Sequence, residues 1–206
     1  LSRREPSWVP ACETRGEGVV FQFSESAVQK WLAQVRQYDA EFFNAHRQWR
    51  ASKNLDPDQG YPGMRYFLLH SFAHAIIRQL AVECGYTTAS IAERVYSRNH
   101  LDGDPMAGVL VYTAAPDSEG TLGGLSALGH PQRLGRHLVQ ALERMSLCAS
   151  DPLCAEHSPN LDSSLHGAAC HACSFLPETS CERGNKYLDR SVLVPTVERD
   201  NLSFFR

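Results

Sequence analysis

The feature that most constrains this chain is a cluster of cysteines in its last third. Five of the seven cysteines fall between positions 148 and 181, and three of them lie in ACHACSFLPETSC, residues 169–181. A secreted disulfide framework more often has an even number of cysteines spread along the chain. The first residues also lack the apolar core of a signal peptide. The pattern therefore favours metal ligation in a reducing compartment, which we expect to be the cytoplasm.

The spacing within the cluster predicts a zinc site. Two residues separate Cys170 from Cys173, so one tight turn can direct both sulfurs at an ion about 2.3 Å away. We expect Cys154 and Cys181 to complete the ligand set, with Cys148 as the substitute for Cys154. Four protein ligands leave no open coordination position, so the predicted zinc is structural and not catalytic. Its binding free energy would contribute directly to folding.

Two other interpretations of the cysteine cluster stay open at this point. A redox-active CxxC pair would sit at a helix N-terminus after a strand, whereas residues 148–181 are rich in loop-forming residues. Structural disulfides are the second alternative. Both predict cysteines that pair with each other and hold no metal.

Hydrophobic periodicity predicts long helices and a small sheet. Residues 19–23 form a short apolar run typical of a strand, and residues 106–115 form a longer, β-branched one. Between them, the chain carries an apolar stripe typical of one long helix over residues 25–51, made by Val28, Trp31, Val35, Tyr38, Phe42, Ala45 and Trp49. Residues 53–63 contain two prolines and two glycines and are expected to form a loop.

The segment after this loop contains the most apolar helix candidate, residues 64–85, which Gly85 should terminate. Residues 131–148 predict a further amphipathic helix, while residues 87–97 fit either a helix or a strand. We therefore expect an α/β (α+β) fold with a zinc-clamped C-terminal loop region. The expected organisation is an N-terminal part, residues 1–63, followed by a zinc-binding domain, residues 64–206.

A polar stripe interrupts the apolar helix at His70, His74 and Arg78, which are four residues apart. An i, i+4 histidine pair can ligate a metal, and a metal-dependent enzyme would use it together with Asp117 and Glu119 of the turn-rich stretch that follows residue 115. The simpler interpretation is a pair of core histidines that are hydrogen-bonded. We do not expect an enzyme.

The charge distribution limits where nucleic acid can bind. The net charge is −3, so no global basic field is present. Residues 145–182 contain five acidic residues and neither lysine nor arginine, so phosphate should be repelled there. The basic residues gather in two other regions, one with Arg36, Arg47, Arg50 and Lys53 and one with Arg133, Arg136 and Arg144. No apolar run approaches the roughly 18–20 residues of a membrane span.

Three stretches in the same order resemble the DrmB family, components of the DISARM anti-phage defence systems of bacteria. They are LLHSFAHAIIRQLAVECGY, AGVLVYTAAPDSEGTLGGL and GAACHACSFLPETSCERGNKYLDR. The last includes Asn185 and the LDR triplet at 188–190 in the order of the family. The stretch WVPACETRGEGVVFQF, near the start of the chain, is similar to what precedes this module in the family. The module itself, the MrfA-type zinc-binding domain, also ends a group of superfamily-two DNA helicases.

The resemblance implies a zinc-binding, non-catalytic component that works with a DrmA-like helicase subunit and engages DNA through that complex. It transfers no catalytic residue. An accessory DNA-binding domain of a DNA-repair helicase is the main alternative, and a scaffold that binds only protein is another.

Overall fold

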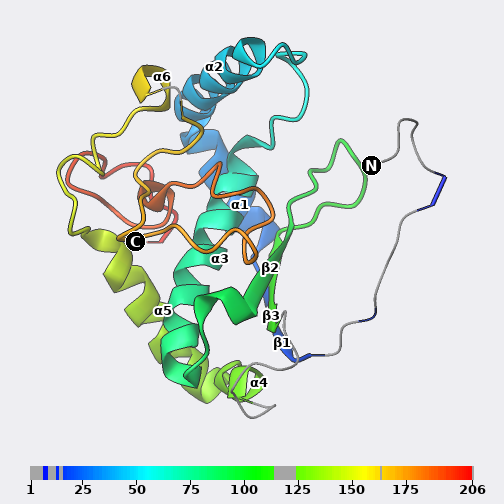
Figure 1. Ribbon diagram of the computed structural model, residues 1–206, viewed down its shortest axis with the longest axis vertical. Helices are drawn as coiled ribbons and strands as arrows, with labels where there is room; N and C mark the ends of the chain where they lie inside the picture. The colour runs from blue at the N-terminus through cyan, green and yellow to red at the C-terminus, as the bar shows by residue number, and fades with distance from the viewer. Residues whose placement is uncertain (1–6, 9–12, 14–15, 114–123, 163, 206) are drawn as a thin grey trace.

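A three-stranded antiparallel sheet lies beside the central helix of the molecule (Figure 1). The computed structural model describes residues 7–8, 13, 16–113, 124–162 and 164–205. The strands are β1 (Gly18–Gln22), β2 (Ile91–Tyr96) and β3 (Gly108–Thr113), in the order β1-β3-β2. The two strands predicted from sequence are confirmed, and residues 87–97 resolve into a short 3-10 turn, Thr88–Ser90, followed by β2.

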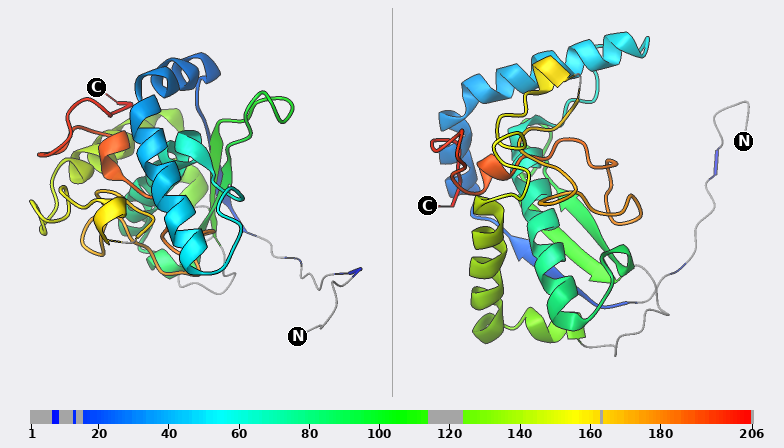
Figure 2. Two further views of the ribbon diagram at one scale, coloured as in Figure 1. Left: turned by 90° about the horizontal axis from the view of Figure 1, so that it is seen from above. Right: turned by 60° about the vertical axis from the view of Figure 1, so that its left-hand side comes forward.

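The predicted helix over residues 25–51 is in fact two helices, α1 (Glu25–Gln34) and α2 (Arg36–Ser52). The chain changes direction between them, as the right-hand view of Figure 2 shows. Val35 leaves helical geometry at φ −101° and ψ 17°, while its side chain remains buried. The apolar stripe continues across the break because both helices cover the same core, so periodicity alone did not reveal it.

Helix α3 (Gly63–Cys84) is the centre of the fold. It is apolar around most of its circumference, and Gly85 ends it in the left-handed conformation at φ +71°, as the sequence predicts. The inward residues of the sheet, including Val109 and Val111, share one hydrophobic core with α3, α1 and α2. Helix α5 (Pro131–Ser146) runs antiparallel alongside α3 and follows the short helix α4 (Gly124–Leu128).

The remainder of the chain, residues 147–205, has little regular structure: α6 (Pro159–Asp162) and a 3-10 turn, Arg190–Val192, are its only helical elements in the described part. It wraps over α3 and returns to the N-terminal elements (Figure 2). There the indole of Trp31 donates to the carbonyl of Leu202 over 2.7 Å. The mixed α+β architecture is thus confirmed. None of the helices in the described chain combines the length and apolar character that a membrane span requires.

Candidate metal centre

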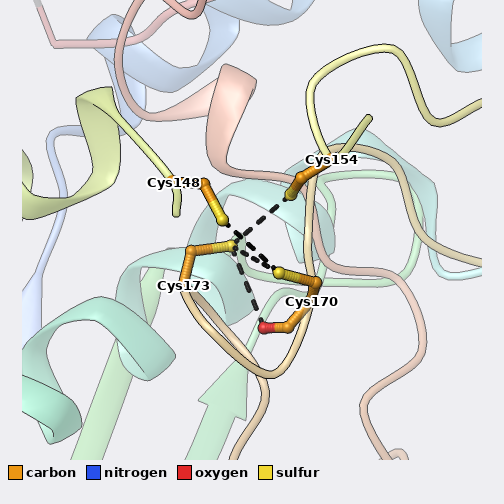
Figure 3. A group of neighbouring side chains, drawn as sticks. All are labelled: Cys148, Cys154, Cys170 and Cys173. Atoms are coloured by element: carbon orange, nitrogen blue, oxygen red, sulfur yellow. Dashed lines mark hydrogen bonds between the residues drawn. The ribbon is translucent and has the colours of Figure 1, made fainter. Parts of the chain in front are cut away.

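Four cysteine side chains converge beside the C-terminal end of α5 (Figure 3). They are Cys148, Cys154, Cys170 and Cys173, and their sulfur atoms all lie within 4.8 Å of one another. The individual S···S distances are 3.5 Å from Cys148 to Cys170, 3.7 Å from Cys154 to Cys173 and 3.8 Å from Cys170 to Cys173. Cys154 and Cys173 are buried, and the other two are half-buried.

These distances fit a metal site and not a disulfide. Four thiolates bonded to zinc at about 2.3 Å in a tetrahedron have sulfur atoms about 3.8 Å apart, whereas a disulfide bond is about 2.05 Å long. All six described cysteines are free. The donor set, four thiolates, is one of those that structural zinc sites use.

The end of α5 and a buried arginine position the first two cysteines. Cys148 follows α5 directly, and its backbone N–H donates to the Asp151 carboxylate over 2.9 Å. Arg190 pairs with the same carboxylate and also donates to the carbonyl groups of Met145, at 2.8 Å, and Ser146, at 3.1 Å. Since Arg190 is fully buried, this pairing fixes the turn that carries both Cys148 and Cys154.

The other two cysteines lie on the tight turn that their spacing predicts. The backbone N–H groups of Ser174 and Phe175 both donate to the carbonyl of Cys170 over 2.9 Å, which closes the turn. The Ser174 hydroxyl donates to the sulfur of Cys173 over 3.2 Å. The hydrogen bond from the Cys154 thiol lowers the pKa of Cys173 to about 5. The same contact, with burial, raises the pKa of Cys154.

The fourth sulfur is not the one that spacing predicts. The structure brings Cys154, Cys170 and Cys173 together, but it adds Cys148 in place of Cys181. Cys148 was expected only as a substitute for Cys154, but both residues lie in the cluster. Sequence separation carries no information about which loop returns to the cluster, so the spacing could not choose between Cys148 and Cys181.

The edge of the sheet holds Cys181 away from the other four sulfurs. The backbone N–H of Glu93 in β2 donates to the carbonyl of Ser180 over 3.2 Å, and the Glu182 carboxylate pairs with Arg94 at 2.7 Å. Residues 180–182 therefore run along β2, and Cys181 lies over its inward face.

There Cys181 joins a second cluster, with His70 and His74 of α3 and Glu93 of β2. All four residues are buried, and their potential ligand atoms lie within 4.8 Å of one another. Burial lowers the pKa of His70, but the charge of Glu93 and the hydrogen bonds with Cys181 and Glu93 together outweigh it, so the net shift is upward. Burial raises the pKa of Cys181, and the hydrogen bond from His70 with the charge of both histidines then brings it down to about 6. The predicted histidine pair thus has two acidic partners that the sequence interpretation did not assign to it.

Glu93 had a signal in the sequence. It falls between Ile91 and Val95 on the alternation that would put all three on one face of a strand. A carboxylate at a core-facing position needs a partner, because a buried lone charge is costly. The interpretation missed it because helix and strand were both open for residues 87–97.

Asn185 and Asp189, both in the last of the three stretches that resemble the DrmB family, hold the loops around the two clusters. The amide of Asn185 makes two hydrogen bonds with the backbone of Leu176, at 3.0 and 2.8 Å, and its backbone N–H donates to the sulfur of Cys181 over 3.2 Å. The buried Asp189 carboxylate accepts from the Tyr38 hydroxyl and from the backbone N–H of Ser191. The backbone of Gly167 passes directly beside that carboxylate.

The remaining candidate residues have different positions. Asp117 and Glu119, which the enzyme alternative requires, lie outside the described residues. Arg47 pairs with Asp58 at 2.8 Å, and Arg50 donates to the carbonyl of Asp56, so both stabilise the 53–62 loop. Arg36, Arg133, Arg136 and Arg144 are exposed.

A comparison with family models identifies the class of protein. The model of the MrfA Zn-binding domain matches residues 72–174, which is half of the chain, and the chain belongs to that family. The matched residues include Cys148, Cys154, Cys170 and Cys173 and stop before Cys181. Zinc is therefore the cofactor, as the cysteine cluster predicts.

A curated relative extends the likeness beyond that domain. The chain is 40% identical over 203 residues to the DISARM protein DrmB of Bacillus paralicheniformis, and the alignment covers 97% of this chain. The resemblance to the DrmB family is thereby confirmed. The chain spans 35% of the length of that relative.

Proposed function

We propose that this chain is a zinc-binding, non-catalytic component of a DISARM-like anti-phage defence complex, in which Cys148, Cys154, Cys170 and Cys173 hold one structural zinc. The observation that carries the proposal is the 40% identity to a DISARM protein along nearly the whole chain. The proposed zinc-binding module runs from residue 64 to residue 206, and Phe21, Trp31 and Phe42 of the part before it belong to the same hydrophobic core.

The environment of the two clusters supports a structural role. Four thiolates around one zinc leave no position for a substrate or an attacking water. The histidine pair of the enzyme alternative has side chains that are 0% exposed, as is Glu93. A substrate would have to displace α3 or β2 to reach them.

We further propose that the chain acts with a DrmA-like helicase and engages DNA together with it. The exposed arginines of α5, Arg133, Arg136 and Arg144, are better placed for phosphate than those of α2, since Arg47 and Arg50 already stabilise a loop. Phosphate contacts of this kind are independent of sequence and sensitive to salt.

The acidic segment of residues 145–182, which carries the four-cysteine cluster, is better suited to contact protein than to contact DNA. Residues 145–182 carry five carboxylates without a lysine or arginine. Within the part of the chain that the structure describes, Arg190 pairs with Asp151 and Arg94 pairs with Glu182. The free cysteines support a reducing compartment, and we propose the cytoplasm.

Co-expression with a DrmA-like helicase tests this function. We expect a stoichiometric complex on size-exclusion chromatography whose affinity for DNA falls steeply with salt. The double variant Arg133→Gln, Arg144→Gln should leave the complex intact and reduce the slope of log K against log salt by about one for each phosphate that is deprived of its arginine. Arg94→Gln, which removes an arginine next to the acidic segment, is the matched control and should leave the slope unchanged.

Two results would contradict the proposal. Failure to bind the helicase, with tight DNA binding by the chain alone, would favour an accessory domain of a repair helicase. Absence of both interactions would leave only a protein scaffold.

A further inference from the structure

The second cluster joins three separate parts of the chain. His70 and His74 come from the middle of α3, Glu93 from the inward face of β2 and Cys181 from the loop that crosses both. The same loop, in orange, lies across α3 and β2 in Figure 1. All four residues are buried.

A hydrogen bond from Nδ1 to a backbone carbonyl orients each imidazole ring. Nδ1 of His70 lies 3.2 Å from the carbonyl of Tyr187, and Nδ1 of His74 lies 2.8 Å from the carbonyl of Ser174. A carbonyl only accepts, so each Nδ1 carries the proton. In the neutral tautomer this leaves the lone pair of each Nε2 directed into the cluster. Protein ligands to zinc have this arrangement, with the second ring N–H donated to a backbone carbonyl.

Hydrogen bonds from backbone N–H groups likewise orient the Cys181 thiol and the Glu93 carboxylate. Backbone N–H groups of Arg183 and Asn185 donate to the sulfur of Cys181 over 3.4 and 3.2 Å, as expected for a thiolate. The backbone N–H of Glu182 donates to Oε1 of Glu93 over 3.3 Å. The outer contacts thus support both acidic groups in the charged form that binds metal.

Four electron-rich atoms then meet at the centre. Nε2 of His70 lies 2.9 Å from Oε1 of Glu93 and 3.2 Å from the sulfur of Cys181, and Nε2 of His74 lies 3.5 Å from the same Oε1. With ordinary zinc bond lengths, a tetrahedron has N···O edges of about 3.3 Å and N···S edges of about 3.6 Å.

Protons alone do not satisfy this group. A proton on Nε2 of His70 would bridge to Glu93 or Cys181. Nε2 of His74 and Oε2 of Glu93, however, are both buried and have no hydrogen-bond partner among the residues that the structure describes. Buried polar atoms are rarely left in this state, and an unplaced ion is one of the ordinary reasons.

We propose that His70, His74, Glu93 and Cys181 bind a second divalent ion, zinc, in a closed site separate from the four-cysteine cluster. Two imidazoles, one carboxylate and one thiolate suit zinc, and the two negative charges among these ligands balance the charge of the ion. The second ion fastens the sheet and α3 to the loop that also carries Cys170 and Cys173. Its role is structural, since four protein ligands fill the coordination sphere.

The metal content of the unaltered chain tests the proposal without any variant. After expression in zinc-supplemented medium, we expect two zinc ions per chain. X-ray absorption at the zinc edge should show five sulfur and three nitrogen or oxygen ligands shared between the two ions. One zinc with four sulfur ligands would overturn the second site and leave the cysteine cluster intact, so the two sites can fail separately.

Variants assign the ions. His74→Gln and Cys181→Ser should each lower the content from two ions to one and leave an ion with four sulfur ligands. His137→Gln is the matched control, because His137 of α5 is equally buried but belongs to neither cluster, and it should retain two ions. Retention of both ions in a folded His74→Gln, Cys181→Ser double variant would also overturn the proposal.

Discussion

The core around α3 and the segment that follows α5 are held together by different means. Around α3, regular helices and strands bury apolar side chains such as Phe67, Leu68 and Ile76. Residues 147–205 have only two short helical elements in their described part. This segment depends on the two clusters of metal-ligating side chains and on buried polar groups such as Asp189 and Arg190. The first part thus packs mainly through apolar burial, whereas the second adds metal-ligating clusters and specific hydrogen bonds to the apolar residues, such as Leu193 and Leu202, that it contributes to the same core.

The comparison shows how the cost of an irregular backbone is met. A loop buries few apolar groups per residue, so the conformational entropy of ordering it needs another source of stabilisation. A structural zinc site contributes on the order of 10 kcal/mol in isolated zinc fingers. A zinc ion in the four-cysteine cluster can stabilise residues 147–205 although their backbone follows an irregular path.

Removing a zinc ligand should have the largest effect. We expect Cys173→Ser to lose the zinc of the four-cysteine cluster and to make residues 147–205 sensitive to protease, because the ion supplies most of the free energy that orders them. Limited proteolysis with mass spectrometry and metal analysis would measure both. Cys84→Ser, at a half-buried cysteine outside both clusters, is the control and should behave as the parent. A stable, metal-free Cys173→Ser with the parental cleavage pattern would remove the contrast between the two regions.

A substitution at Arg190 should have the next largest effect. Arg190→Met leaves the Asp151 carboxylate and two carbonyls at the end of α5 without their partner, and loss of one member of a buried pair costs about 3–5 kcal/mol. Leu68→Ala in the core should cost a similar amount, about 2–5 kcal/mol. Urea unfolding would give both values.

Arg190→Met and Leu68→Ala should differ in the rate at which they release zinc to a chelator. Arg190→Met should accelerate it, because Arg190 orders the turn that carries Cys148 and Cys154. Leu68→Ala should leave it near the parental rate. Equal acceleration in both would mean that the two regions are not stabilised independently.

The smallest effect concerns a polar contact within the core region. Hydrogen bonds from Arg65, at 2.5 and 2.6 Å, lower the pKa of Glu25 from its ordinary value of 4.5 to about 2. A lowered pKa stabilises the fold above pH 4.5, and this contribution is lost as the pH falls from 4.5 towards 2. Glu25 is 35% exposed, so solvent screening keeps its worth small.

We therefore expect Glu25→Gln to lower the free energy of unfolding at pH 7 by about 1–2 kcal/mol, mainly through the unpaired Arg65 guanidinium. The difference from the parent should be constant between pH 7 and 5 and shrink below 4.5. Urea unfolding of both proteins at matched pH measures it, and loss of zinc in acid affects the two alike. A difference that grows as the pH falls would contradict the assignment.

The same contrast explains what could be predicted from the sequence. Helix α3 and its end at Gly85 follow from local periodicity and were predicted, as were strands β1 and β3, with bounds that differ by one or two residues. The break at Val35 was not, because the apolar stripe continues through it. The C-terminal segment was predicted only as a zinc-clamped loop region.

The composition of the site depends on contacts between distant residues. The turn of Cys170 and Cys173 is local and was predicted, whereas the exchange of Cys181 for Cys148 depends on the pairing of residues 180–182 with β2. Glu93 and Cys181 are 88 positions apart in the chain, so no short-range pattern could join them. Alternation in β2 would have revealed Glu93 alone as a core-facing carboxylate.

The close approach of Gly167 to Asp189 limits how this chain can be redesigned. A methyl group at position 167 would collide with a carboxylate oxygen that Tyr38 already holds in place, and unlike the tip of a lysine, that oxygen has nowhere to retreat. Gly167 does not adopt a positive φ, so a designer who screens glycines by backbone angle alone would mark it as safe for alanine. The tolerance of the zinc-binding half to substitution is thus bounded at a residue that contributes no side chain.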